Sequence, residues 1–259
     1  MKNGLLVDLG LIEYGAAWDL QRRLVAARKA GAVVDVLLLC EHPPVITLGR
    51  NGKASHLHAS DHVLRQMGIS FFETDRGGDI TYHGPGQLVG YPILNLSEIR
   101  RDVGWYVRSL EEAMIRATAD FGISSRRVAG RTGVWVDVPA RNLAAASDPP
   151  ATFPVQPTDE EKLAAIGVHL SRWVTSHGFA YNVSTDLRHF DLIIPCGIVG
   201  KRATSLEKLL NRRVKMKEAA SRIARHLSEL LEVEFQPVPL DELHSMLRTH
   251  ESQSALAAV

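Results

Sequence analysis

The chain of 259 residues has little cysteine, few aromatic residues and almost no net charge. Its two cysteines, Cys40 and Cys196, are too few for a disulfide framework or a four-cysteine zinc site, so we expect a reducing compartment. The formal charge of +1 argues against a dedicated nucleic-acid-binding protein. No apolar run reaches the roughly 18 residues of a membrane span. The first residues become charged too soon for a secretory signal, so a cytoplasmic protein is the expectation.

The apolar pattern predicts short strands interleaved with three long helices. About 45% of the residues are apolar, which is enough for one sizeable core. Helical spacing covers 14–30, 103–121 and 214–231, and a short helix at 241–247 precedes an expected frayed tail at 251–259. Strands are expected at 5–9, 33–39, 45–48, 71–74, 88–94, 134–136, 162–170 and 173–183. This mixture predicts the α+β class, with a mixed sheet flanked by helices. We expect one domain over 1–259, with its core at about 4–231, an exposed loop at 139–159 and a C-terminal extension at 232–259.

The last two strands are expected to pair, with a bend near Ser176–Gly178. Side chains alternate along a strand, which places Lys162 in phase with the more apolar set, Ala164, Ile166, Val168 and Leu170. Desolvation on such a face would disfavour the charged form of the amine, which makes Lys162 a candidate proton acceptor. A lysine at the first position of a strand can also reach solvent, and this alternative stays open.

A glycine-rich segment, Arg76–Gln87, keeps a short β-like piece at Ile80–Tyr82. Glycine lets a ligand approach the main chain closely, and the polar side chains around it supply donors and acceptors. The segment matches neither the phosphate loop nor the G-x-G-x-x-G pattern, so no nucleotide cofactor is indicated. A tight hairpin without a ligand remains the alternative.

A second candidate is Cys196, where an apolar strand end runs into the turn Pro195–Gly197. A thiol is a nucleophile only as its thiolate, and a nearby Lys162 could take the proton and pair with the resulting charge. His42 and His83 are rival partners for this thiol. A purely structural role remains open for Cys196 and is favoured for Cys40, which ends an apolar strand without polar company.

Taken together, these segments resemble the octanoyl-[acyl-carrier-protein]:protein N-octanoyltransferases, also called lipoyl or octanoyl transferases. The resemblance spans roughly residues 4–230, and its motifs stand in the order of that family. They are Glu41–Arg50, Arg76–Gln87, Gly133–Val136, Lys162–Gly167, Gly178–Val183, Pro195–Gly197 and Thr204–Leu206.

The resemblance implies the fold of lipoate and biotin protein ligases, an acyltransferase activity, and no cofactor or metal. It implies that Cys196 carries the acyl group as a thioester and that Lys162 activates it. The implied acyl contacts are Arg76, Gly77, Gly78, Asp79, Ile80, Thr81, Tyr82, His83, Ala165, Ile166, Gly167, Gly178, Phe179 and Ala180. No catalytic role is assigned to Asp79, and the Arg141–Asp159 stretch is longer and richer in Ala and Pro than the family pattern.

The implied donor is octanoyl-acyl carrier protein, and the implied acceptors are lipoyl domains of 2-oxoacid dehydrogenase E2 subunits and the glycine-cleavage H protein. Nucleic acid and membrane are not expected partners. Carrier proteins are acidic, so a basic rim is expected at the mouth of the site, with Arg50, Lys53, Lys201 and Arg202 as candidates. Backbone N–H groups near Cys196, Gly77–Gly78 or Gly84–Gly86 are candidate oxyanion donors.

Two other functions stay open. An ATP-dependent lipoate-protein ligase on the same scaffold would make an acyl-adenylate and would need no cysteine at position 196. A non-catalytic acyl-binding or carrier-binding module would keep the glycine-rich pocket, with Cys196 serving only for packing.

Overall fold

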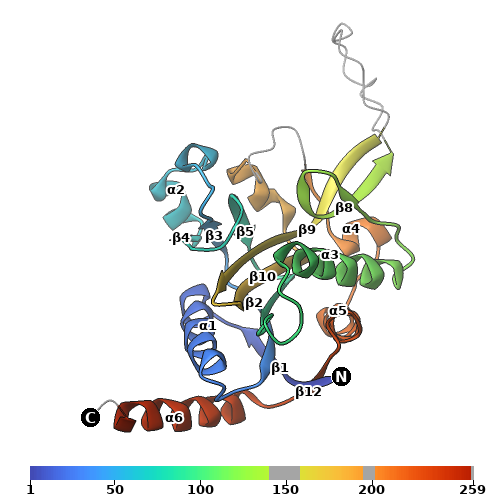
Figure 1. Cartoon of the computed structure of the whole chain (residues 1–259). Coiled ribbons are helices and arrows are strands. Elements are labelled where there is room, and N and C mark those ends of the chain that lie inside the picture. The colour runs from blue at the N-terminus through green and yellow to red at the C-terminus, as the bar shows by residue number, and fades with distance from the viewer. Residues whose placement is uncertain (140–157, 195–201, 258–259) are drawn as a thin grey trace, which may run out of the picture.

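The structure is a computed structural model that describes residues 1–139, 158–194 and 202–257. Within these ranges, nine strands form one mixed sheet through the middle of the molecule (Figure 1). The main path runs β12 (Val233–Pro237), β1 (Lys2–Leu11), β2 (Asp35–Glu41), β6 (Gln87–Ile93), β10 (Val174–Asn182), β9 (Thr158–Ser171), β8 (Arg131–Pro139) and β7 (Arg126–Val128), and β11 (Arg202–Ala203) pairs with β9 beside it. β1 is parallel to both of its neighbours, whereas adjacent strands from β2 to β7 are antiparallel. The predicted α+β class with a mixed sheet is confirmed.

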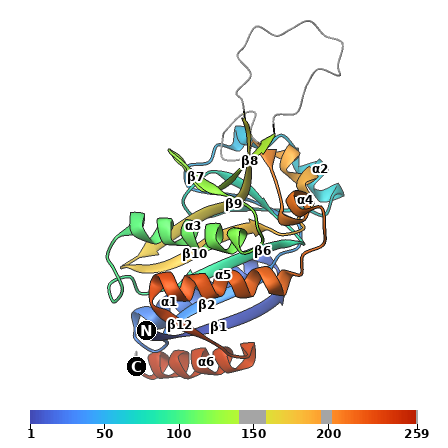
Figure 2. The same cartoon turned by 90° about the vertical axis from the view of Figure 1, so that its right-hand side faces the viewer.

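One face of this sheet is covered by two long helices, α3 (Val103–Ala119) and α5 (Met216–Leu231), which Figure 2 shows side by side. Asp102 caps α3 by accepting the backbone N–H of Trp105 at 2.9 Å. The helix buries residues at three- and four-residue intervals, among them Tyr106, Leu110, Ala113, Met114 and Ala117. These side chains and those of α5 form the largest apolar core with Leu163, Phe179 and Tyr181 from the sheet.

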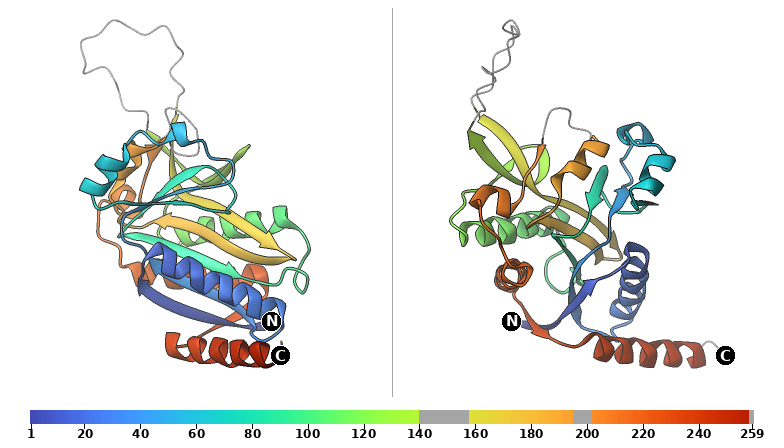
Figure 3. Two further views of the ribbon diagram at one scale, coloured as in Figure 1. Left: turned by 90° about the vertical axis from the view of Figure 1, so that its left-hand side faces the viewer. Right: turned by 180° about the vertical axis from the view of Figure 1, so that it is seen from behind.

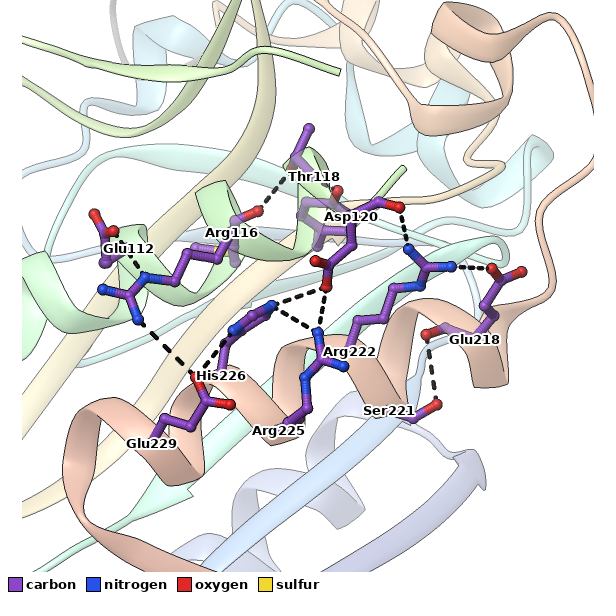
Figure 4. Close-up of polar contacts among 12 residues, drawn as sticks. Glu112, Arg116, Thr118, Asp120, Glu218, Ser221, Arg222, Arg225, His226 and Glu229 are labelled. Carbon is purple, nitrogen blue, oxygen red and sulfur yellow. Dashed lines mark hydrogen bonds and ion pairs between the residues drawn. The ribbon is translucent and has the colours of Figure 1, made fainter. Parts of the chain in front are cut away.

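Polar side chains join the outer edges of α3 and α5 (Figure 4). The Asp120 carboxylate at the end of α3 accepts a hydrogen bond from Arg225 at 2.6 Å and lies 2.8 Å from the Nε2 atom of His226. Arg222 donates to the main-chain carbonyl of Asp120 and, at 2.6 Å, to Glu218. Polar contacts at the edge of a helix pair add little stability, so the apolar packing beneath them contributes most to holding α3 against α5.

The opposite face of the sheet is covered partly by helices α1 and α6 and partly by a smaller sheet (Figure 3). Helix α1 (Tyr14–Lys29) packs Ala17, Leu20 and Leu24 into a core with residues of β1, β2 and β6. Helix α6 (Leu240–Ala257) adds Leu243 and Leu247 to the same core.

A smaller sheet covers the rest of that face, over β9 and β10. Within the described ranges it consists of β4 (Ser70–Glu73), β3 (Val45–Leu48) and β5 (Ile80–His83), with β3 in the middle. Its outer side packs with α2 (Asp61–Gln66) and the short 3₁₀ helix η2 (Leu187–Leu192) around Ile46, Ile80 and Tyr82. The remaining short elements are the 3₁₀ turn η1 (Ala54–His56) and α4 (Leu206–Leu210).

Several details of the predicted elements are wrong. The hairpin bends at Arg172–Trp173, with φ of 52° and 66°, rather than at Ser176–Gly178, which lie within β10. The tail is helical to Ala257 because Leu243 and Leu247 anchor α6 in the core. Strand β12, which no strand prediction covered, lies parallel to β1 and buries Val233 and Phe235.

The predicted loop at 139–159 falls mostly outside the described residues, and its ends belong to β8 and β9. In the parts of the chain that the structure describes, every helix is too short or too polar to span a lipid bilayer.

Candidate active site

A cavity of about 360 Å³ lies between the smaller sheet and strands β9 and β10. Tyr14 of α1 and Val89 and Tyr91 of β6 close one side of it. Most of the predicted acyl contacts line this cavity: Arg76, Gly78, Asp79, Ile80, Thr81, His83, Ala165, Ile166, Gly167, Gly178, Phe179 and Ala180. The volume is within the range of about 300–1,000 Å³ that small-molecule sites occupy.

Two predicted contacts do not line the cavity. Tyr82 alternates to the outer face of β5, where its ring stacks on His189 at 4.9 Å between centroids and burial raises its pKa to about 12. Gly77 lies against the edge of β9, where its N–H donates to the carbonyl of Val168 at 2.9 Å. Tyr82 therefore packs on the outer side of the smaller sheet, and Gly77 connects the 76–78 loop to β9.

Small residues make the floor of the cavity. Ala165 pairs with Ala180 across β9 and β10, and Gly167 pairs with Gly178. A Cβ atom at Gly167 would lie 2.6 Å from the carbonyl oxygen of Gly77, so only glycine allows the 76–78 loop to cross the sheet this closely. At these four positions the floor therefore carries no side chain larger than a methyl group.

Arg76 is buried and fixed to β3. Its Nη2 atom donates to the Thr47 carbonyl at 2.7 Å and to the Thr47 hydroxyl at 2.9 Å. Burying a guanidinium is costly unless it is hydrogen-bonded, so these contacts stabilise Arg76 in the wall that the smaller sheet gives to the cavity.

Asp79 holds the next turn of the loop in place. One of its carboxylate oxygens accepts the N–H of Ile80 at 2.7 Å, and the other lies 2.6 Å from the Nδ1 atom of His56. The carbonyl of His56 accepts the N–H of Ile194 at 2.8 Å. The chain that leads into Pro195–Gly197 is thereby anchored beside the cavity.

Lys162 also lines the cavity, but not for the predicted reason. Val134 pairs with Ala164 and Trp135 with Lys162, so Leu163 is an extra residue that bulges β9 and shifts the alternation. Leu163, Ala164 and Ile166 belong to the core under α3 and α5, whereas Lys162 lies on the opposite face with its amine 5.3 Å from the Trp135 ring centroid. The prediction that Lys162 shares the face of Ala164 and Ile166 is wrong, and so is its place at the start of the strand.

Cys196 lies outside the described residues, as does Lys201. The chain re-enters them at Arg202 and Ala203, and Ala203 pairs with Lys162. A small pocket of about 20 Å³ next to the main cavity is lined by Lys162, Ala180, Arg202 and Ala203, among other residues. Both described ends of the segment that carries Cys196 thus lie next to the cavity or to Lys162.

The two rival histidines are buried in the wall of the site. His42 has its Nδ1 atom 2.7 Å from the Ile12 carbonyl and its Nε2 atom 2.7 Å from the Tyr91 hydroxyl, and burial lowers its pKa to about 4. His83 Nδ1 lies 2.7 Å from the side-chain oxygen of Gln87, and burial lowers its pKa to about 3. Both rings are therefore neutral near pH 7.

Cys40 lies in the same wall, with its sulfur 3.6 Å from the Nε2 atom of His42. It is 2% exposed, and burial raises the pKa of its thiol well above the ordinary range. A thiol held neutral in this way supports the structural role that the sequence favours for Cys40.

The sequence missed several cavity residues. His177 lines the cavity with a φ of 55°, its Nε2 atom 2.7 Å from Asp75, and burial lowers its pKa. Val89 and Tyr91 lie two residues apart on a strand that was predicted, so their side chains share one face. This spacing could have indicated that both lie on the cavity side. Within the described ranges, no three His, Cys, Asp or Glu side chains gather closely enough to hold a metal ion.

Comparison with known sequences gives a consistent picture. The family model for the lipoyl protein ligase A/B catalytic domain matches residues 13–228. The octanoyltransferase of Solibacter usitatus is 50% identical over 237 residues, which cover 92% of this chain and 97% of that protein. The octanoyltransferase of Koribacter versatilis is 44% identical, with coverage of 97% and 93%.

Solved structures agree on the fold. The bi-partite lipoate protein ligase of Thermoplasma acidophilum superposes with a TM-score of 0.68 at 16% identity, covering 96% of this chain and 92% of that one. Lipoate-protein ligase A bound with ATP gives a TM-score of 0.64 at 18% identity, covering 96% and 93%. The predicted likeness to the lipoate ligase fold is confirmed.

Proposed function

Because the chain belongs to the lipoyl protein ligase A/B catalytic-domain family and its curated relatives are octanoyltransferases, we propose that it transfers an octanoyl group to a lysine of lipoyl domains. The donor in this proposal is octanoyl-acyl carrier protein. The observation that carries it is the cavity itself, which has a floor of glycine and alanine and Lys162 in its wall.

The proposed reaction has two halves. Lys162 accepts the proton of Cys196, and the thiolate attacks the octanoyl thioester, so that a new thioester forms and the carrier thiol leaves with a proton. The ε-amine of the acceptor lysine then attacks this thioester, the amide forms, and Cys196 regains its proton. Exchange of one thioester for another needs no ATP.

Lys162 is a better proton acceptor for this thiol than either histidine. Each rival ring has both of its nitrogens close to other groups, His42 to Ile12 and Tyr91, and His83 to Gln87 and Thr47. Lys162 lies beside Ala203, where the chain re-enters the sheet after the segment that carries Cys196.

The oxyanion donors are proposed to come from the backbone around Cys196. In the other two candidate turns, one N–H group each is already in use, since Gly77 donates to Val168 at 2.9 Å and Gly86 donates to Glu41 at 2.7 Å. A hydrogen bond already made inside the fold would have to break before it could stabilise developing charge.

The carrier is proposed to dock on a basic rim. Arg50, Lys53 and Arg202 are exposed, and Asn51 between the first two lines the cavity. The acceptors are proposed to be lipoyl domains of 2-oxoacid dehydrogenase E2 subunits and the glycine-cleavage H protein, and the location to be cytoplasmic.

The test is intact mass measurement after mixing the protein with octanoyl-carrier protein and no ATP. One octanoyl group should be added and then released by hydroxylamine, and it should be absent in Cys196→Ser but present in Cys40→Ala. A mass gain that survives Cys196→Ser would remove the thioester from the mechanism. Transfer that requires ATP would favour the ligase, and binding without transfer would favour the acyl-binding module.

Lys162→Ala tests the proton acceptor. At neutral pH the rate of acylation should fall by about 10²–10⁴, with partial recovery at alkaline pH, where the thiol ionises without help. Lys208→Ala is the matched control, because Lys208 pairs with the neighbouring Glu161 at 2.7 Å and does not line the cavity. Neutral-pH rates equal to those of this control would exclude Lys162 from the mechanism.

A further inference from the structure

Helix α3 carries a buried carboxylate that the reaction above does not use. Glu111 is 6% exposed and faces the sheet rather than solvent. Its Oε1 atom accepts the backbone N–H of Gly133 at 2.9 Å, and its Oε2 atom accepts from Arg127 at 3.0 Å. Arg127 is held in turn by the carbonyl of Arg108 at 2.9 Å and by Glu112 at 2.8 Å.

Gly133 is the residue against which the Lys162 side chain rests. A Cβ atom built on Gly133 would lie 2.7 Å from Cε of Lys162 and 3.3 Å from its Nζ atom. The φ of Gly133 is 128°, a conformation that residues with a side chain rarely adopt. Glycine at position 133 therefore leaves space beside β8 that the Lys162 side chain occupies. The next two residues, Val134 and Trp135, lie opposite the bulge of β9.

The backbone N–H of Gly133 needs an acceptor, because the ladder with β9 begins only at Val134. A buried main-chain N–H without an acceptor destabilises the fold, and a buried carboxylate is tolerated only when it is paired and hydrogen-bonded. Glu111 meets both needs at once, since it accepts from Gly133 on one oxygen and from Arg127 on the other.

We propose that Glu111 is a positioning residue for Lys162. It fixes the backbone at Gly133, and the Lys162 side chain lies against that backbone with its amine in the cavity wall. Arg127 assists by holding the second carboxylate oxygen. The inference rests on the proposed function, in which the amine of Lys162 takes the proton of the thiol.

The experiment compares two neighbouring glutamates of α3 in the full chain. Glu111→Ala removes the acceptor of Gly133, and kcat for octanoyl transfer should fall by about 10–100-fold with little change in KM, because misplacing a catalytic group by about 1 Å has effects of this size. Glu112→Ala is the matched control. Glu112 accepts hydrogen bonds from Arg127 at 2.8 Å and from Arg116 at 2.9 Å, the second of which Figure 4 shows. The N–H of Gly133 donates to Glu111 instead. Its kcat should stay close to that of the wild type.

Glu111→Gln separates positioning from charge. Its amide oxygen can still accept from Gly133, so kcat should return to within a few-fold of the wild type. If Glu111→Ala does not fold, Arg127→Met decides the question with a several-fold loss of kcat. Equal kcat in Glu111→Ala and Glu112→Ala, or unchanged kcat in Arg127→Met, would overturn the inference, whereas a wild-type protein without octanoyl transfer would overturn the proposed function instead.

Discussion

Strands β9 and β10 have two faces with opposite character. On the face under α3 and α5 they present large side chains, Leu163, Phe179 and Tyr181, which are at most 3% exposed. On the other face the same strands present Ala165, Gly167, Gly178 and Ala180 to the cavity. Large and small residues therefore alternate along one pair of strands.

This contrast shows how the cavity is made. The floor of the site results from small side chains at every second position of two central strands, and the 76–79 loop lies over this floor. The filled face carries stability, and the open face can carry a ligand without weakening the core beneath it. Adjacent residues should accordingly respond to mutation in different ways.

Phe179→Ala should give the largest effect on stability. The ring lies in the core over Gly90, so its removal should lower the free energy of unfolding by about 3–5 kcal/mol. Urea unfolding measures this. Transfer activity per folded molecule should fall less than in Ala180→Leu, although Phe179 also lines the cavity. A normal unfolding midpoint with lost activity would instead make the Phe179 ring an acyl contact, as the resemblance implies.

Ala180→Leu should reverse the pattern one residue along the strand. Leucine adds three carbons that enter the cavity, so octanoyl transfer should fall by at least the roughly 10–200-fold that one misplaced methylene costs in an apolar pocket. The free energy of unfolding should change by less than about 1–2 kcal/mol, since the space is open.

Steady-state rates with octanoyl and butanoyl carriers check the Ala180→Leu prediction. The shorter chain should be affected less, and Ala180→Gly should keep activity on octanoyl. Equal losses on both chains would mean that the cavity floor does not contact the acyl group.

The alternation that builds this site is visible in the sequence, and so were most of its residues. Apolar runs predicted β2 and β6, and an alternating pattern was recognised in β9, which was expected to pair with β10. The cavity-lining glycines and alanines stand in segments that the family resemblance carried. Alternation alone could not predict which face of the sheet the Lys162 side chain lies on. The extra residue Leu163 shifts the alternation, so every side chain before it in β9 lies on the opposite face from the one predicted.

Other parts depended on contacts distant in the chain. Strand β12 is stable because it pairs with β1 at the other end of the sequence, and α6 is long because Leu243 and Leu247 find the core beside α1. In the sequence Glu111 cannot be distinguished from other polar residues of its helix. Its buried contact with the N–H of Gly133 exists only once β8 has packed against α3. The sequence pattern of one segment cannot predict which distant segment it pairs with.

The cavity side should also be the acid-sensitive side of the molecule. Burial lowers the pKa of His42 to about 4 and that of His83 to about 3, below the value of about 6.5 expected in the unfolded chain. Between these values the unfolded state binds the protons and the folded state does not. Stability is therefore complete above about pH 6.5 and is lost as the pH falls, by up to about 1.4 kcal/mol per pH unit for each histidine.

Urea unfolding at pH 7, 6 and 5 measures this loss, and His42→Gln should reduce its slope by about one proton. The change is expected to be clear because the carboxylates with lowered pKa, such as Asp186 at about 2, titrate at lower pH than this interval. Phe179→Ala serves as the control, since it weakens the filled face and should leave the slope unaltered. The same pH dependence in His42→Gln and the wild type would mean that protonation of other groups causes the loss of stability. The two faces of the sheet would then not differ in their sensitivity to acid.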